Sequence, residues 1–414
     1  MDRVILHSDI NNCFASIELL YRPELKGIPV AVCGDQSERH GIVLSKDELA
    51  KKAGVKTGEA IWQARQKCPG LTVVEPHFDR YIKYSRMIRE IYADYTDRCE
   101  AFGIDESWLD ITGCYACRDG ARTARDINER IKRETGLTVS VGVSWNKVLA
   151  KLGSDYKKPD AVTVIDREHF KGMVWPLPAS DLLMVGRSTA SRLARMGIYT
   201  IGDIARTDPE ILGARLGKGG VMLYAFANGR DTSPVRRTDD IPEAKSIGNS
   251  TTTARDITNE AEARLVLLTL AESVGARLRE GGFKCRTVEL SIRSAENLSW
   301  RSHRMRLRYA TDLTDEILFA AMELMRECRE GGEILRSAGV RALELVRADA
   351  PEQMDLLCDY VNRDKKRRLD FTMDGIRGKY GFDSIRRASA VHDAQLGSLN
   401  AKEGHTVHPV GFAG

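Results

Sequence analysis

Through residue 165 of this 414-residue chain, short apolar runs alternate with segments whose apolar positions recur at helical spacing. The runs predict strands at residues 4–8, 28–34, 99–104, 107–111, 138–143 and 162–165, and residues 41–45 begin a small mixed section. Helical spacing follows residue 11 and returns at 46–52, along a stripe from Tyr81 to Ile91, at 118–134 and at 146–156. The order, β-α and then β-β-α-β, predicts a split βαβ, ferredoxin-like sheet.

The same order of elements appears a second time near the C-terminus. Residues 167–232 have the pattern of short helices joined by short loops, and 231–245 form a polar segment with two prolines, which predicts a linker. Beyond it we expect strands at 246–253, 285–293, 299–309 and 338–346, with helices at 259–280 and 313–329. The pattern therefore predicts an α+β chain, and its length suggests two to four domains.

Composition narrows the class of protein. Hydrophobic residues make up 42% and charged residues 29%, as in soluble globular proteins, and the net charge of +4 permits an anionic partner. No apolar run approaches the ~20 residues of a membrane span, and the N-terminus leads straight into a strand, so we expect a cytoplasmic protein without a signal peptide. The nine cysteines are scattered, which predicts free thiols, and Cys114 and Cys117 lack the second pair that a zinc site needs.

The candidate chemistry lies in carboxylates at the ends of predicted buried strands. Asp9 follows the first strand, and Asp105 with Glu106 separates the two strands of the predicted hairpin. Burying a carboxylate is costly unless positive charge compensates it. Because the first strand and the hairpin lie side by side in this fold, the three carboxylates can converge, and a divalent metal would relieve their repulsion. Asp110 lies at the far end of its strand and is left out of the predicted ligands.

Two hard cations held by carboxylates at a sheet edge suit phosphoryl transfer, because they activate a hydroxyl and neutralise the leaving phosphates. The backbone carbonyl of Ile10 is a further predicted ligand. Lys158 precedes a proline, which favours an extended backbone, and it is a natural counter-charge for phosphate. The predicted triphosphate contacts at the start of the following helix are the N–H groups of Asn12, Cys13 and Phe14.

A glycine between two helices predicts a phosphate contact in the helical section. The segment consists of Gly186, Arg187, Ser188 and Thr189, with Ser and Thr at the next helix start, as in a helix-hairpin-helix. Free N–H groups at such a helix start bind DNA phosphates without reading bases. An ordinary αα-turn would have the same pattern.

An alternating strand predicts a second DNA contact. Arg304, Arg306 and Arg308 alternate with Met305, Leu307 and Tyr309. Period two puts the apolar side chains against the helices and the arginines on the open face, ~6.7 Å apart, where each can meet a different phosphate. The alternative is a sheet face that is merely solvated.

Several blocks together resemble the signature blocks of the Y family of DNA polymerases, and among these the bacterial DinB-like DNA polymerase IV group. The blocks are Asp9–Glu18, Gly103–Asp110, Ser140–Lys147 with Ala150 and Lys151, and Lys158 with Pro159. Their order and spacing match over roughly residues 1–390. The resemblance implies a multi-domain right-hand polymerase that adds deoxynucleotides to a primer in template order, with two Mg²⁺ ions. It further implies error-prone translesion synthesis without proofreading.

The resemblance also implies boundaries and partners. The implied sections are a palm at 1–10 and 77–166, fingers at 11–76, a thumb at 167–232, a linker at 233–245, a little finger at 246–350 and a C-terminal extension at 351–414. The implied partners are primer–template DNA, deoxynucleoside triphosphates and a sliding clamp, and we expect a monomer. Clamps bind short Gln-Leu-rich peptides, which residues 395–399 resemble poorly, so a flexible tail is the alternative. The basic run at 365–368 predicts a solvated or disordered segment that attracts DNA.

The residues carried over from the family are the catalytic metal carboxylates Asp9, Asp105 and Glu106, and Phe14 as a steric gate. An aromatic ring there would clash with a ribose 2′-hydroxyl, although the pattern alone makes Phe14 a core residue.

The fingers depart from the family. They usually read Tyr-x-Ala-Arg, but here they read Glu48-Leu49-Ala50-Lys51. Lys51 keeps the positive charge of the usual arginine but lacks its two-pronged guanidinium, and Glu48 would sit badly beside a phosphate unless its side chain turns away. Ser45 and Lys51 are the expected nucleotide contacts.

Two other functions use some of the same features. A nucleotidyl cyclase can use paired acids on a ferredoxin-like sheet and needs no DNA, but the second sheet and its arginines would then have no purpose. A non-catalytic DNA-binding scaffold would not need the three carboxylates, although Glu48 is a feature that such a protein would tolerate.

Overall fold

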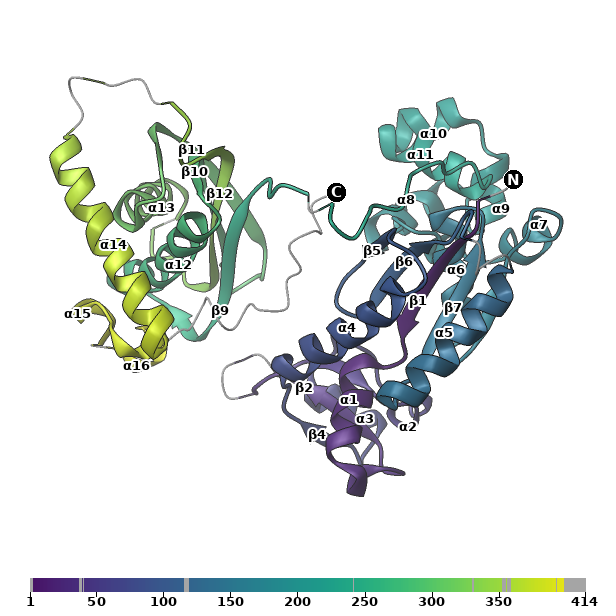
Figure 1. Cartoon of the computed structure of the whole chain (residues 1–414). Coiled ribbons are helices and arrows are strands. Elements are labelled where there is room, and N and C mark those ends of the chain that lie inside the picture. Colours follow the sequence, from purple (N-terminus) through teal and green to yellow (C-terminus); the bar gives the residue numbers. More distant parts are fainter. Residues whose placement is uncertain are drawn as a thin grey trace. The chain divides into compact units, whose positions relative to one another are not determined.

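The computed structural model describes residues 3–36, 39, 41–114, 119–240, 242–329, 331–351, 355, 359–391 and 393–397. The chain forms two compact units, one of residues 1–33 and 43–241 and one of residues 34–42 and 242–414 (Figure 1). Cys117 and residues 398–399, which belong to the candidate zinc and clamp motifs, lie outside the described residues. Among the described residues, no helix has the length and apolar character needed to cross a membrane.

The first unit is built on a five-stranded sheet in the order β5-β6-β1-β7-β8. Strand β1 (Ile5–Ile10) is central and antiparallel to both neighbours, β6 (Glu106–Asp110) and β7 (Val139–Ser144). The edge strands are β5 (Cys99–Ala101) and β8 (Val162–Val164). Leu6 and its neighbours pack under α4 (Phe78–Ala93) and α5 (Gly120–Thr135), while Ile5 packs against α6 (Lys147–Tyr156). This is the predicted order of elements, with β1 extended through Asp9 and Ile10.

A small α/β section follows β1. It contains α1 (Cys13–Tyr21), η1 (Pro23–Leu25), β2 (Val30–Cys33), β3 (Val43–Lys46), α2 (Glu48–Lys52), α3 (Ile61–Lys67) and β4 (Thr72–Val74). The sheet order is β3-β2-β4, and β4 pairs parallel to β2. The sequence did not predict β4, because three residues are too few for a periodic signal.

The helical section of the first unit has the predicted character. Its elements are α7 (Phe170–Val174), η3 (Ala179–Asp181), α8 (Arg187–Arg195), α9 (Ile201–Arg206), α10 (Pro209–Leu216) and α11 (Lys218–Ala227). The segment predicted as a linker starts differently. Val235 is buried in a cluster with Ile5 and Trp108, and Arg236 binds Glu100 at 3.1 Å. Residues up to Thr238 are thus held on the first unit by Val235, by the ion pair of Arg236 and by hydrogen bonds from Thr238 to the carbonyl of Asp97. A single buried valine leaves no periodic signal in the sequence.

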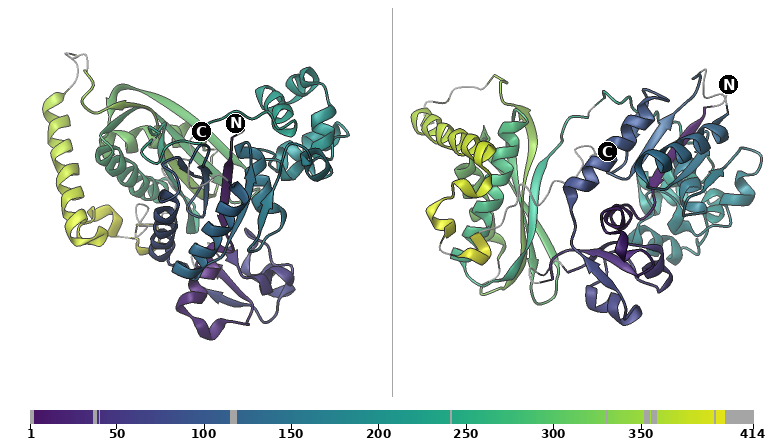
Figure 2. Two further views of the ribbon diagram at one scale, coloured as in Figure 1. Left: turned by 45° about the vertical axis from the view of Figure 1, so that its right-hand side comes forward. Right: turned by 60° about the horizontal axis from the view of Figure 1, so that its bottom comes forward.

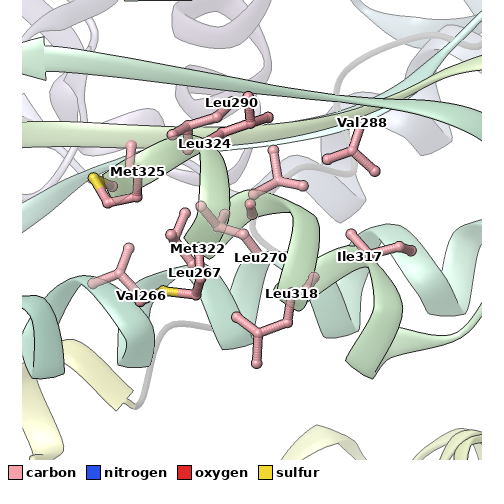
Figure 3. Close-up of a cluster of buried hydrophobic side chains, with 14 of the residues drawn as sticks. Val266, Leu267, Leu270, Val288, Leu290, Ile317, Leu318, Met322, Leu324 and Met325 are labelled. Atoms are coloured by element: carbon pink, nitrogen blue, oxygen red, sulfur yellow. The ribbon is translucent and has the colours of Figure 1, made fainter. Parts of the chain in front are cut away.

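The second unit repeats β-α-β-β-α-β, as predicted. Its elements are β9 (Ile247–Ile257), α12 (Glu260–Glu280), β10 (Phe283–Ser294), β11 (Trp300–Thr311), α13 (Thr314–Cys328) and β12 (Leu335–Arg347). The sheet order is β11-β10-β12-β9, so β11 is an edge strand of the sheet. The two helices cover one face of the sheet. The core lies between these helices and the sheet, and it includes Leu270, Val288, Ile317 and Met322 (Figure 3).

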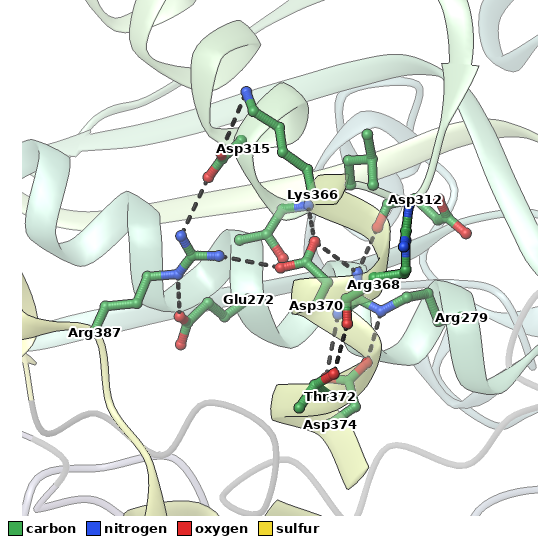
Figure 4. Close-up of polar contacts among 12 residues, drawn as sticks. Glu272, Arg279, Asp312, Asp315, Lys366, Arg368, Asp370, Thr372, Asp374 and Arg387 are labelled. Atoms are coloured by element: carbon green, nitrogen blue, oxygen red, sulfur yellow. Dashed lines mark hydrogen bonds and ion pairs between the residues drawn. The ribbon is translucent and has the colours of Figure 1, made fainter. Parts of the chain in front are cut away.

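The C-terminal part of the second unit differs from the prediction. Helix α14 (Tyr360–Tyr380) contains the basic run and lies over α12 and α13 as a third layer (Figure 2). Its Asp370 is buried and accepts the N–H of Thr314 at 2.9 Å, while Arg279 and Arg387 approach it at 3.3 and 3.1 Å (Figure 4). The basic run at 365–368 is thus helical and only partly solvated. Arg367 pairs with Asp312 at 2.7 Å and Lys366 with Asp315 at 3.4 Å, whereas Lys365 and Arg368 are exposed.

Two short helices, α15 (Ala388–Val391) and α16 (Ala394–Gly397), follow η4 (Phe382–Ser384). Leu396 is fully buried in the core of the second unit. At Leu396 the candidate clamp segment is therefore not a flexible tail. The buried side chain of this residue is also not freely accessible to a partner.

Candidate active site

The register of the first sheet brings the predicted carboxylates together. Asp9 on β1 lies directly opposite Glu106 on β6, and the N–H of Ile10 donates to the carbonyl of Asp105 at 3.0 Å. Strand pairing therefore places the three acidic residues at one end of the sheet.

Burial and mutual repulsion dominate the electrostatics of these groups. Burial raises the pKa of Asp9 to about 6, and the charge of Glu106 adds to the shift while Lys158 opposes it. Burial likewise raises the pKa of Asp105 to about 6, with further contributions from Glu106 and Asp9. The cluster thus carries negative charge that positive partners can stabilise.

Lys151 on α6 and Lys158, just beyond the end of that helix, supply positive charge. Lys158 Nζ lies 2.6 Å from Asp9 Oδ2 and 2.7 Å from Asp155 Oδ1. Lys151 Nζ lies 2.9 Å from Glu106 Oε1, 3.3 Å from Asp155 Oδ2 and 3.7 Å from Asp9 Oδ2. The sequence predicted Lys158 but assigned no role to Lys151 and Asp155. Their spacing of four residues, which puts them on one helix face, was the available signal.

The donor set fits a hard divalent cation. Glu106 Oε2 is buried and has no hydrogen-bond partner, and it faces the equally unpartnered Nε2 of His7 at 3.4 Å. Burial and the charge of Lys151 lower the pKa of His7, so a neutral ring faces the carboxylate. Carboxylate oxygens are the ligands that Mg²⁺ prefers. Among the described side chains, however, no three His, Cys, Asp or Glu residues are arranged as a metal cage.

The turn after β1 presents backbone N–H groups beside these carboxylates. Asn12 adopts a left-handed conformation, with φ of 49°, and precedes the first residue of α1. The N–H groups of Cys13 and Phe14 lie in the first turn of this helix, where no intrahelical acceptor is available. The Cys13 side chain is buried, so the backbone of this residue is the part that can meet a ligand.

Phe14 lies on the edge of the core rather than inside it. Its ring is half-buried and stacks on Tyr81, with centroids 4.2 Å apart and planes 6° apart, and Phe78 meets it edge-on at 6.1 Å. The Tyr81 hydroxyl donates to Glu18 Oε1 at 2.8 Å. The ring is thus held in one orientation by Tyr81, which begins the helical stripe seen in the sequence, and by Phe78, which the sequence analysis did not single out.

The fingers residues approach the same turn. Ser45 Oγ accepts the N–H of Ala15 at 3.4 Å. Glu48 Oε1 accepts the side-chain N–H of Asn12 at 2.9 Å and lies 3.4 Å from Lys51 Nζ. Glu48 therefore faces the turn and Lys51.

The predicted DNA contacts are on the surface of their own sections. Gly186 precedes helix α8, where it, Arg187 and Ser188 are exposed and Thr189 is half-buried.

The three arginines of β11 are exposed, whereas Met305 and Leu307 pack against the core. Two of the arginines already have partners: Arg304 binds Glu289, and Arg308 binds Asp355, both at 2.6 Å. Glu289 follows the same alternation on β10, which could have predicted its place on the open face.

Comparison with known proteins agrees with this fold. Residues 8–155 match the impB/mucB/samB family, and residues 244–356 match the C-terminal domain of the same family. The chain is 48% identical over 400 residues to DNA polymerase IV of Acetivibrio thermocellus, covering 96% of this chain and 100% of that protein. It is 36% identical to DNA polymerase IV of Clostridium acetobutylicum, covering 94% and 98% of the two chains.

Solved structures show the same architecture. A Y-family DNA polymerase chimera built on Dbh superimposes with a TM-score of 0.72 at 25% identity, over 83% of this chain and 99% of the other. A Dbh ternary complex superimposes with a TM-score of 0.57 at 24% identity, which bears on the fold alone. The predicted multi-domain right-hand fold is therefore confirmed, while the exact section boundaries stay a prediction.

Proposed function

This chain belongs to the impB/mucB/samB family of Y-family DNA polymerases, and we propose that Asp9, Asp105 and Glu106 form its catalytic metal site. It is a DinB-like, DNA-directed DNA polymerase that extends primers in template order and carries out error-prone translesion synthesis. This family membership favours a polymerase over the nucleotidyl cyclase and the scaffold that the sequence left open.

The proposed cofactor is a pair of Mg²⁺ ions held by these three carboxylates and the carbonyl of Ile10. When bound, Mg²⁺ activates the primer hydroxyl and neutralises charge on the leaving phosphates. The N–H groups at the start of α1 and Lys158 bind the triphosphate of the incoming nucleotide. Phe14, held against Tyr81, excludes a ribose 2′-hydroxyl. Absence of proofreading stays a prediction.

The observation that carries this proposal is the pairing of Asp9 with Glu106 across adjacent strands, with Asp105 next in sequence and two lysines beside them. Primer extension with Mg²⁺ against EDTA is the test, on undamaged and abasic templates. Asp9→Ala and Glu106→Ala should abolish extension on both. Asp110→Asn, at the other end of the strand that carries Glu106, is the matched control and should extend primers normally. Extension by either alanine variant at the wild-type rate would refute the metal assignment.

The proposed DNA contacts are the start of α8, from Gly186 to Thr189, and the arginines of β11. A phosphate contact is sensitive to salt but not to base sequence. Arg306→Ala should therefore weaken binding to every duplex and reduce the slope of log affinity against log salt by about 1. An unchanged slope would favour a merely solvated sheet face.

The remaining partners are proposals as well. We infer a cytoplasmic monomer that takes deoxynucleoside triphosphates and uses a sliding clamp. The segment at 395–399 is a poor site for that clamp, since Leu396 is buried.

A further inference from the structure

Glu48, the first residue of α2, contacts the turn between β1 and α1 that carries the proposed triphosphate contacts. One carboxylate oxygen accepts a hydrogen bond from the Asn12 side chain at 2.9 Å and lies 3.4 Å from the ammonium of Lys51. The family resemblance led us to expect an aromatic residue at this position. The contact is therefore one in which this chain departs from the usual fingers pattern.

The backbone that carries Glu48 is firmly anchored. Asp47, the residue before it, is buried and caps α2 by accepting the N–H of Ala50 at 2.8 Å. The same oxygen accepts the N–H of Val30 on strand β2 at 3.1 Å. Because helix α2 is fixed to the sheet in this way, Glu48 presents its carboxylate from a rigid base.

The turn that Glu48 contacts is fixed on its other side by β7. Asn11 donates its side-chain N–H to Thr138 Oγ1 at 3.0 Å and accepts the hydroxyl of Ser140 at 2.8 Å. Asn12 follows in a left-handed conformation, which asparagine adopts more readily than most residues other than glycine and which contacts with neighbouring residues can stabilise. Glu48 supplies such a contact from the fingers side.

The same carboxylate offsets the charge of Lys51. The two side chains are 34% and 46% exposed, so neither is locked in the interior. Burial would raise the pKa of Glu48, but the hydrogen bond from Asn12 and the charge of Lys51 lower it, so the group is ionised at neutral pH. A carboxylate here reduces the net attraction that Lys51 exerts on a triphosphate.

We propose that Glu48 is a positioning residue for the incoming nucleotide, acting through Asn12 and Lys51. Its hydrogen bond aligns the turn for the chemical step, and its charge weakens binding of the triphosphate. The inference rests on the proposed function of this site. The two effects can be separated, because glutamine retains an acceptor oxygen without the charge, whereas alanine retains neither.

Single-nucleotide insertion with the full chain on primer–template DNA tests this proposal. Glu48→Gln should lower the KM for the deoxynucleotide about threefold to tenfold and leave kcat within about twofold. Glu48→Ala should lower kcat about tenfold, because the turn loses its tie. Adding Glu48→Ala to Asn12→Ala should reduce kcat no further, since the contact is already lost.

Glu59→Gln is the matched control. It removes one carboxylate from the same fingers section, where Glu59 pairs with Lys67 and not with the turn, and it should have wild-type constants. A wild-type KM for Glu48→Gln, or equal kcat values for the glutamine and alanine variants, would overturn the proposal. If Glu48→Ala has a lowered unfolding midpoint, its kcat also reflects lost stability, and the KM of Glu48→Gln then decides whether the proposal holds.

The outcome is distinguishable from failure of the proposed function. If the metal assignment is wrong, Asp105→Ala will extend primers whatever the Glu48 variants do. If only the role of Glu48 is wrong, Asp105→Ala will be inactive while both Glu48 variants match the wild type.

Discussion

Replacing Lys158 with alanine should impair nucleotide insertion more than any other single change at the lysine pair. The ammonium of Lys158 lies 2.6 Å from Asp9 and 2.7 Å from Asp155, and its side chain is 26% exposed. Burial would lower the pKa of Lys158, but the two carboxylates raise it to about 12, so it is charged at neutral pH. It is therefore poised to bind a phosphate.

A hydrogen bond between charged groups contributes about 1.5–3 kcal/mol. With 1.36 kcal/mol for each factor of ten, loss of one such contact to the triphosphate lowers kcat/KM about tenfold to 150-fold. The change should be mainly in KM if the contact is equal in the ground and transition states, and mainly in kcat if it forms only in the transition state.

The assay is steady-state insertion of one correct deoxynucleotide, with DNA affinity measured separately. Lys157→Ala is the control, because Lys157 is the exposed neighbour of Lys158 in sequence. We expect the control to stay within about twofold of the wild type. A loss below about threefold for Lys158→Ala, or an equal loss for the control, would refute the assigned role of Lys158 in binding phosphate.

Phe14→Ala should raise ribonucleotide incorporation by at least about tenfold, because the ring stacked on Tyr81 no longer blocks the 2′-hydroxyl; an unchanged ratio of ribo- to deoxynucleotide insertion would make Phe14 a core residue only. Asp370→Ala should lower the free energy of unfolding by about 2–4 kcal/mol, measured by urea titration, because Arg279, whose side chain is 3% exposed, loses a partner. Hydrogen bonds from the backbone N–H groups of Thr200 and Tyr199 lower the pKa of Asp203 to about 2, so its contribution to stability is complete above about pH 4 and is lost as pH falls through 2. Asp203→Asn should remove that part of the pH dependence of the free energy of unfolding, measured between about pH 5 and 2. A pH dependence that coincides with that of the wild type would contradict the lowered pKa of Asp203.

Features set by local pattern could be predicted from the sequence. The predicted strands of the first sheet are short apolar runs, and the order of elements then fixes which strands are neighbours. The pairing of Asp9 with Glu106 follows from that order, because the first strand lies beside the hairpin. The alternation along β11 likewise predicted which side chains are exposed.

Features that depend on partners distant in sequence could not be predicted. Helix α14 carries a basic run in which Lys366 and Arg367 pair with Asp315 and Asp312, which lie outside that helix in the second unit. Val235 and Leu396 are single apolar residues in polar surroundings, and their burial depends on the pockets that receive them. The orientation of Glu48 depends on Asn12, which lies 36 residues earlier in the chain.

The most direct test of the central claim is single-turnover primer extension by Asp105→Ala, compared with its affinity for primer–template DNA. Asp105 belongs to the carboxylate cluster. Among the described residues, Lys151 and Lys158 form ion pairs with Asp9 and Glu106 but not with Asp105. The account predicts that the variant binds primer–template as tightly as the wild type and adds no nucleotide in the presence of Mg²⁺. Extension at the wild-type rate would contradict it.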